Sequence, residues 1–218
     1  TIDDIVDVIR EEETEDVHKM AAVQVLDESY MSSSVFEVIK KRSGWLMVLF
    51  VGESFTATAM SFFEDQIAKA VVLALFVPLI ISSGGNTGSQ ASTLIIRSLA
   101  LGEVTVRDWW KIFSKEIKVG IILGIILGIF GFLRVAVWNS FIDVYGPHWL
   151  LIAVTVGLSL VGVVLWGNLM GTIFPFILKR FGLDPAVSSA PFVATMVDIT
   201  GLLIYFTIAS LLLTGVLL

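Results

Sequence analysis

The sequence predicts an all-α, polytopic membrane protein with five transmembrane helices per subunit. Hydrophobic residues make up 56% of the 218 residues, and the mean hydropathy of +0.90 is above the range of soluble domains of this size. Five apolar segments follow a polar start, and each is near or above the length of about 20 residues that crosses a bilayer. They lie at residues 44–63, 67–100, 112–137, 149–173 and 186–217.

Residues 1–42 are polar and form a unit distinct from the apolar residues 43–218. Half of the 20 carboxylates lie between Asp3 and Glu28, which argues against a nucleic-acid partner. Ser34 and Glu37 have the spacing of a capping box and predict the start of a helix that leads into the first span. Because the chain opens on Thr1 and not on Met, we expect a fragment of a longer protein.

Loop charges predict the orientation of the chain in the membrane. Lysine and arginine cluster before the first span, between spans two and three, and between spans four and five. The opposite side carries only Lys69 and Arg134. By the positive-inside rule the N-terminus is cytoplasmic and the C-terminus is outside. Tryptophans near the span ends, as expected for interfacial anchors, are Trp45, Trp109, Trp110, Trp138 and Trp149.

Two carboxylates lie well inside apolar segments, Asp198 in "ATMVDITG" and Glu53 in "FVGESFTA". A charge at bilayer depth costs at least ~2.5–3.5 kcal/mol, so such residues usually mark an ion or proton path. The alternative for Asp198 is a structural carboxylate that is paired or protonated between helices. The alternative interpretation of Glu53 is a side chain whose hydrogen bond supports helix packing. The chain has no cysteine and two histidines, which gives no basis for a thiolate or histidine metal site.

The stretch SSGGNTG, at residues 82–88, predicts an interruption of the second span. Irregular backbone at membrane depth is tolerated where it is buried in protein or lines a water-filled cavity. Broken helices also turn carbonyls toward an ion path, and Asn86 adds a neutral oxygen. The alternative is glycine-mediated helix packing through Gly84 and Gly88, which are four residues apart.

The fifth span carries a similar mixture of small and oxygen-bearing residues. Asp198 shares one helix face with Thr195 and Ala194, which are three and four residues before it. Pro191 inside the helix would free a carbonyl near Val187 as an acceptor. One carboxylate among small residues and neutral oxygens suits a hard divalent cation that keeps its water.

The strings "PLIISSGGNTGSQASTLIIRSLALGE" and "GNLMGTIFPFILKRFGLDPAVSSAPFVATMVDITG" resemble the transmembrane helices of the bacterial MgtE magnesium channel family. "GESFTATAMSFFE" is similar to the family's first helix. "TIDDIVDVIREEETEDVHKM" resembles the end of its CBS domain and the start of its connecting helix. The resemblance covers essentially the whole chain.

The resemblance implies a homodimer in the bacterial inner membrane, with a pore along the dimer axis that passes partly hydrated Mg²⁺. It also implies that cytosolic domains, of which residues 1–42 are the tail, close this pore when Mg²⁺ is plentiful. Asp198 becomes the central pore carboxylate and Asp184 falls at the cytoplasmic mouth. The hydrated ion, both cargo and pore-bound, would be held further by Gly84, Gly85, Asn86 and Ala194.

Other functions remain open on the sequence alone. A broader divalent-cation transporter for Mn²⁺ or Co²⁺, or an exchanger coupled to Na⁺ or H⁺, would also use Asp198 and Glu53. An intramembrane hydrolase is disfavoured because His18 and His148 lie outside the spans and Asp198 has no second aspartate in an equivalent helix. A membrane scaffold would need no polar residues within two of its helices.

Overall fold

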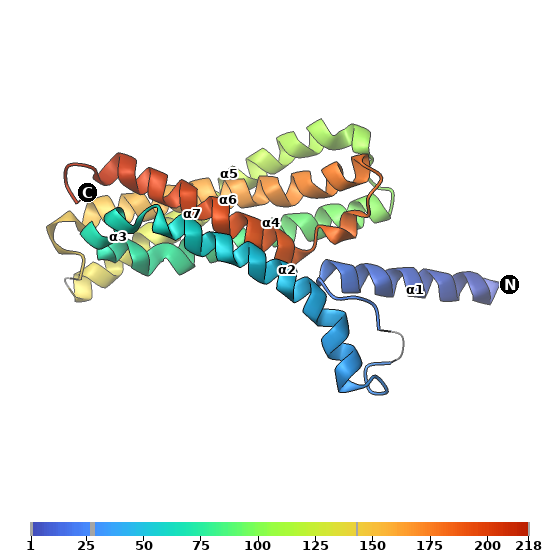
Figure 1. Cartoon of the computed structure of the whole chain (residues 1–218). Coiled ribbons are helices and arrows are strands. Elements are labelled where there is room, and N and C mark those ends of the chain that lie inside the picture. Colours follow the sequence, from blue (N-terminus) through green and yellow to red (C-terminus); the bar gives the residue numbers. More distant parts are fainter. Residues whose placement is uncertain (1, 27–28, 143, 218) are drawn as a thin grey trace.

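The computed structural model describes residues 2–26, 29–142 and 144–217, and every regular element in these ranges is a helix. The all-α prediction is therefore confirmed for the described chain. Figure 1 shows a bundle of long helices from which the N-terminal helix α1 (Ile2–Met20) extends away at one end.

Helix α2 (Val35–Ser61) connects the N-terminal arm to the bundle. Ser34 caps it as the sequence predicts, because the Ser34 hydroxyl accepts a hydrogen bond from the backbone N–H of Glu37 at 3.2 Å. The helix continues without a break from its charged start, across Lys40 to Arg42, into its apolar part. From Trp45 onward it lies beside α7 (Ala190–Leu213) and the residue that caps it.

The predicted interruption of the second span at SSGGNTG is wrong. Helix α4 runs from Val77 to Ala100 as regular α-helix through the whole stretch. The irregular backbone lies upstream, where the short helix α3 (Glu64–Lys69) ends at Ala70 and a 3₁₀ segment, η1 (Val71–Phe76), precedes α4.

Two features keep α4 helical across its polar residues. The hydroxyls of Ser83 and Thr87 donate to the carbonyls of Leu79 and Ser83, four residues before each of them, so these side chains need no partner outside the helix. The glycines are held by close contact with helix α6 (Trp149–Arg180). An added Cβ at Gly84 would lie 2.5 Å from Val163 Cγ1. The packing alternative for Gly84 and Gly88 is therefore the one that the structure shows.

The remaining elements are long helices joined by short turns. A 3₁₀ turn, η2 (Val106–Asp108), leads into α5 (Trp109–Phe141), and η3 (Gly146–His148) leads into α6. A third turn, η4 (Pro185–Val187), precedes α7. Within the described residues, four helical segments are long and apolar enough to cross a membrane, at Val71–Ala100, Val106–Phe141, Gly146–Arg180 and Ala190–Leu213. Helix α2 is not among them, so the first of the five predicted spans stays a prediction.

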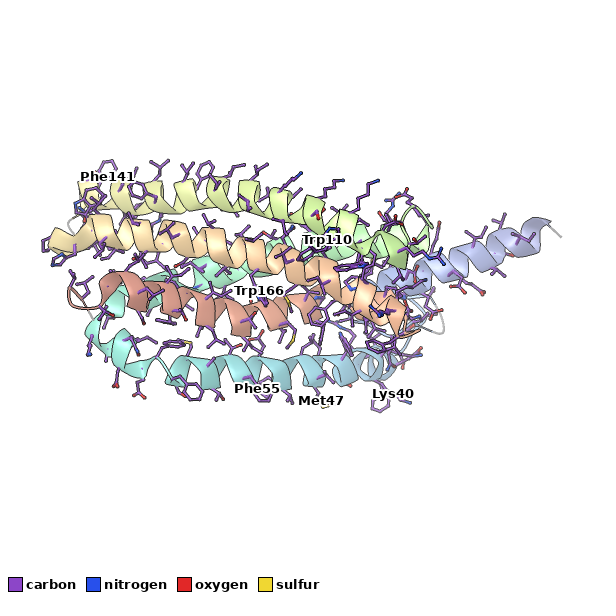
Figure 2. All side chains as sticks on the ribbon, turned by 90° about the horizontal axis from the view of Figure 1, so that it is seen from above. Lys40, Met47, Phe55, Trp110, Phe141 and Trp166 are labelled. Atoms are coloured by element: carbon purple, nitrogen blue, oxygen red, sulfur yellow. The ribbon has the colours of Figure 1, made fainter. Side chains whose placement is uncertain are left out.

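Helix α6 organises the bundle, because it packs against α4, α5 and α7. Figure 2 shows α5, α6, α7 and α2 in parallel rows, with α5 and α2 on opposite edges. The core between them is apolar and is centred on fully buried side chains such as Val163, Tyr205 and Phe206. The Tyr205 hydroxyl donates to the carbonyl of Leu73 at 2.8 Å, which ties α7 to the irregular segment before α4.

Candidate functional site

The start of α7 is set by a cap and a proline. Ser189 precedes the helix, and its hydroxyl accepts a hydrogen bond from the Phe192 N–H at 3.4 Å. Pro191 lies in the first turn, where its missing N–H has no partner to lose. The prediction that Pro191 lies inside a helix and frees a carbonyl near Val187 is therefore wrong, because Val187 belongs to the separate turn η4.

Helix α4 holds the segment before α7 through side-chain to backbone hydrogen bonds. The Ser92 hydroxyl donates to the Ser188 carbonyl at 2.9 Å, and the Ser89 hydroxyl donates to the Ala190 carbonyl at 3.0 Å. These bonds join two regions about a hundred residues apart in the chain. They fix the register between α4 and α7, and so decide which α4 residue faces Asp198.

That residue is Gly85. A Cβ added to Gly85 would lie 3.4 Å from Asp198 Oδ1 and 3.5 Å from Ala194 Cβ. Asp198 lies about two turns into α7 and is partly buried. The structure thus brings together Gly85, Ala194 and Asp198, three of the residues that the sequence analysis selected.

Glu53 approaches the same place from α2. The Thr195 hydroxyl donates to Glu53 Oε1 at 3.4 Å, and the carboxyl groups of Glu53 and Asp198 are close enough to interact. The two helices meet closely here, since a Cβ on Gly52 would lie 2.7 Å from Thr195 Cγ2. Glu53 therefore faces α7, and two carboxylates from two helices lie at one site.

Two predicted site residues lie elsewhere. Gly84 faces the junction of α6 and α7, where Val163 of α6 and Val197 of α7 fill the space that its side chain would take. Asn86 is exposed on α4, and its amide donates to Ser82 Oγ at 3.4 Å. In the contacts described for this chain, Gly85 lies beside the Asp198 carboxylate, whereas Gly84 and Asn86 contact other residues.

Asp184 lies at the end of the bundle that α1 reaches. Lys19 Nζ of α1 is 2.7 Å from Asp184 Oδ2 and also pairs with Glu15. The backbone N–H of Ala186 donates to Asp184 Oδ1 at 2.9 Å. Burial alone would raise the pKa of Asp184, but the bonds from Lys19 and Ala186 outweigh it and hold that pKa below its usual value.

The same contacts raise the pKa of Lys19, first through its bond to Asp184 and then through its bond to Glu15. Asp184 and Lys19 line a cavity of about 540 Å³, together with Asp16 of α1 and Ile96 and Ala100 at the end of α4. The pKa of Asp16 is raised by burial and by the nearby Asp184 charge. This end of the bundle is therefore a charged pocket in which three carboxylates face Lys19, which is paired with Asp184, and Lys179.

Comparison with known proteins decides the family. The MgtE pattern, described as a divalent cation transporter, matches residues 77–208. The chain belongs to the MgtE family.

Three curated MgtE relatives are each named "Magnesium transporter MgtE". The one from Thermus thermophilus is 42% identical over 99% of this chain and 46% of its own length. Those from Enterococcus faecalis and Bacillus subtilis are 33% and 30% identical over 97% and 96% of this chain, and over 44% of their own lengths. The chain thus spans a little under half the length of these relatives.

The MgtE-family chain also has polar contacts that the sequence analysis did not identify. The amide of Asn168, a buried residue of α6, donates to the Glu116 carbonyl at 2.8 Å and to Glu116 Oε2 at 2.9 Å. The Trp166 indole N–H donates to Thr200 Oγ1 at 2.8 Å, two residues beyond Asp198. Asn168 is a polar residue within the apolar run of α6, and this position could have marked it as a candidate for a buried hydrogen bond. Nothing in the local sequence signals the pairing of Lys19 with Asp184.

In the described part of this MgtE chain, no three histidine or acidic side chains gather as a metal-binding group. The site near Asp198 offers two carboxylates and otherwise small or neutral side chains. A single chain therefore attracts a cation through the charge of its carboxylates but offers few atoms that could coordinate it directly. This arrangement suits an ion that retains its water.

Proposed function

We propose that this chain forms the membrane pore of a Mg²⁺ transporter, with Asp198 as the carboxylate that selects the ion. The contact of Asp198 with Gly85 carries the proposal. Glycine leaves open the space beside a carboxylate at bilayer depth, where a charge is costly unless it serves an ion path. Family membership and the printed names of the three relatives support Mg²⁺ as the cargo.

Selection of Mg²⁺ would rest on charge and on hydrated size. Mg²⁺ sheds water reluctantly and usually binds through one or two carboxylates while keeping several waters. Asp198 supplies the charge, and α2 brings a second carboxylate, Glu53, whose Oε1 accepts a hydrogen bond from Thr195. Gly85, Asn86, Ala194 and Thr195 complete the group we propose around the path, whereas Gly84 serves the packing of α4.

A homodimer completes the pore in this proposal, because two copies of Asp198 at one axis attract a divalent ion more strongly than a monovalent one. Helix α2 is the first of five spans, so that residues 43–218 form the pore domain. The protein lies in the bacterial inner membrane with its N-terminus in the cytoplasm, as its loop charges favour. Residues 1–42 link it to cytosolic domains.

The charged pocket at Asp184 is the cytoplasmic mouth in this proposal. The bond between Lys19 and Asp184 places α1 across that mouth and occupies a carboxylate that an ion would otherwise meet. Movement of α1 would therefore change both access and charge at the mouth.

The test is ²⁵Mg²⁺ or dye-reported Mg²⁺ uptake into proteoliposomes. The unmodified protein is compared with Asp198→Asn and with Asp65→Asn, which removes the same charge from an exposed position on α3. We expect uptake by the unmodified protein and by Asp65→Asn, and its loss in Asp198→Asn. Equal uptake in all three would refute the role of Asp198.

The proximity of the Glu53 and Asp198 carboxyl groups favours one second candidate, an exchanger coupled to H⁺. A pH-sensitive dye inside the same liposomes separates the two. Proton movement opposite to Mg²⁺, abolished by Glu53→Gln, would support exchange. Equal rates for Mn²⁺, Co²⁺ and Mg²⁺ would instead indicate a broader divalent-cation transporter.

A further inference from the structure

A groove lies between η1 and the first half of α4 on one side and the second half of α5 on the other. Its volume is about 620 Å³. Most of its walls are apolar, and they include Leu75, Phe76, Leu79, Leu127, Phe130 and Leu160. It is separate from the Asp198 site, because none of the residues that line it contacts that carboxylate.

One positive charge lines this groove, the guanidinium of Arg134. Arg134 is exposed and lies over the ring of Trp138, with Cζ 4.2 Å from the ring centroid. Among the described residues no carboxylate lies within ion-pair distance of Arg134. Arg134, on an apolar helix, thus has an aromatic neighbour and, within residues 2–26, 29–142 and 144–217, no paired carboxylate.

The position of Arg134 along α5 indicates its depth in a membrane. Figure 2 shows Trp110 and Phe141 near opposite ends of α5. At 1.5 Å per residue, Arg134 lies about 36 Å along the helix from Trp110. A bilayer with its headgroup regions is about 40–45 Å thick. With Trp109 and Trp110 at one interface, Arg134 reaches the headgroup level of the opposite leaflet, one turn short of Trp138.

We propose that this groove binds one anionic phospholipid, with its phosphate on Arg134 and an acyl chain along the apolar walls. A guanidinium can donate two parallel hydrogen bonds to a phosphate, and these charge-assisted bonds are among the strong ones. An anionic lipid supplies the missing counter-charge. A zwitterionic lipid brings its own cation and neutralises Arg134 less well. The apolar walls distinguish a lipid from free phosphate.

Native mass spectrometry of the whole chain in detergent tests the proposal. The protein is titrated with phosphatidylglycerol and with phosphatidylcholine of identical acyl chains. We expect Arg134→Gln to weaken phosphatidylglycerol binding about tenfold, as expected for the loss of a hydrogen bond between charged groups. Arg134→Lys should keep part of that affinity. Lys115→Gln is the matched control, since it removes an exposed charge near the other end of α5 and should change nothing.

A second variant tests the groove itself. Leu79→Trp fills it and should weaken binding of both lipids while Arg134 is unchanged. Circular dichroism checks that each variant keeps its helices.

Three results would overturn the proposal. Arg134→Gln and Lys115→Gln could have equal effects. Inorganic phosphate at matched concentration could displace the lipid, which would make this a phosphate site. Arg134→Gln could dissociate a dimer without changing lipid binding, which would make the occupant a second copy of the chain.

Discussion

The two faces of α4 use the same glycine-rich stretch for opposite purposes. On one face, Gly84 and Gly88 meet α6 so closely that a Cβ on Gly167 would lie 2.2 Å from the Gly84 carbonyl oxygen. On the other face, a Cβ on Gly85 would make an ordinary contact at 3.4 Å with Asp198. One face excludes any side chain, while the other would accept one and lacks it.

Within residues 82–88, this difference separates glycines that helix packing explains from one glycine that it does not explain. Small residues let helix backbones approach within a membrane, and that approach explains Gly84, Gly88, Gly167 and Gly171 without reference to an ion. Packing alone does not require glycine at position 85. The missing side chain there keeps the space beside a carboxylate open, and under the proposed function a hydrated ion would pass there.

The largest expected effect comes from breaking the packed face. An added Cβ at Gly171 would lie 2.0 Å from the Gly88 carbonyl oxygen, so Gly171→Ala must push α4 and α6 apart. We expect a loss of about 3 kcal/mol in the free energy of unfolding. Thermal unfolding in detergent measures it.

The matched control is Gly44→Ala in α2, where nothing lies within 4 Å of the added Cβ. This change should stabilise the protein by about 0.5–1 kcal/mol, because alanine favours a helix over glycine. Similar unfolding temperatures for Gly171→Ala and the unmodified protein would contradict the packed face.

The next effect comes from filling the open face. Gly85→Ala adds a methyl group at contact distance from Asp198 and Ala194, so stability should hold. Under the proposed function, Mg²⁺ uptake should fall on the order of tenfold, which corresponds to about 1.4 kcal/mol in the barrier. Proteoliposome flux and thermal unfolding are measured on the same preparation. Lost stability with unchanged flux would reverse the assignment of the two faces.

A smaller effect tests the end of α4, where Ile96 and Ala100 line the cavity that holds Asp184. Lys19→Met removes the ion pair that holds α1 there and should weaken its docking by about 1 kcal/mol, since the pair is partly exposed. Hydrogen exchange of α1 measures the change. Lys19→Arg, which keeps the charge, is the control.

The pH dependence of α1 docking follows from the pKa values of Asp184, Lys19 and Asp16. The pKa of Asp184 is lowered, so its contribution is present above its ordinary value of 3.8 and is lost as the pH falls through the lower folded value. The pKa of Lys19 is raised, so its contribution is present below 10.5 and is lost at higher pH. The ion pair of Lys19 and Asp184 should therefore contribute equally between these limits. The pKa of Asp16 in the same cavity is raised, so docking should weaken as the pH rises through the folded pKa of Asp16. A loss of α1 docking near neutral pH would show that the ion pair of Lys19 and Asp184 does not hold α1.

The smallest effect comes from the link between α2 and α7. The bond from Thr195 to Glu53 is long, at 3.4 Å, and Thr195→Val should cost no more than about 0.5 kcal/mol. Thermal unfolding measures it, with Thr93→Val as a control on an exposed hydroxyl that bonds within its own helix. A large loss for Thr195→Val would show that this bond anchors α2.

Much of the helical architecture was predictable because its signals are local. Apolar length predicted the four helical segments that the structure contains, and Ser34 capped α2 at the expected place. The spacing of Ala194 and Asp198 placed them on one face of α7. The break at SSGGNTG was mispredicted because glycine and polar side chains oppose a helix only until neighbouring helices and i−4 carbonyls satisfy them.

Residue types and their order were enough to show which segments are helical and apolar, where charge lies, and that Asp198 and Glu53 stand out within apolar segments. Only the tertiary structure decided that Gly84 faces α6 while Gly85 faces Asp198, and that Lys19 meets Asp184 across 165 positions. Local structure and helix register differ in how far apart along the chain the interacting residues lie. Helix periodicity arises from bonds four residues apart, whereas the register between helices arises from packing of whole surfaces that no local pattern encodes.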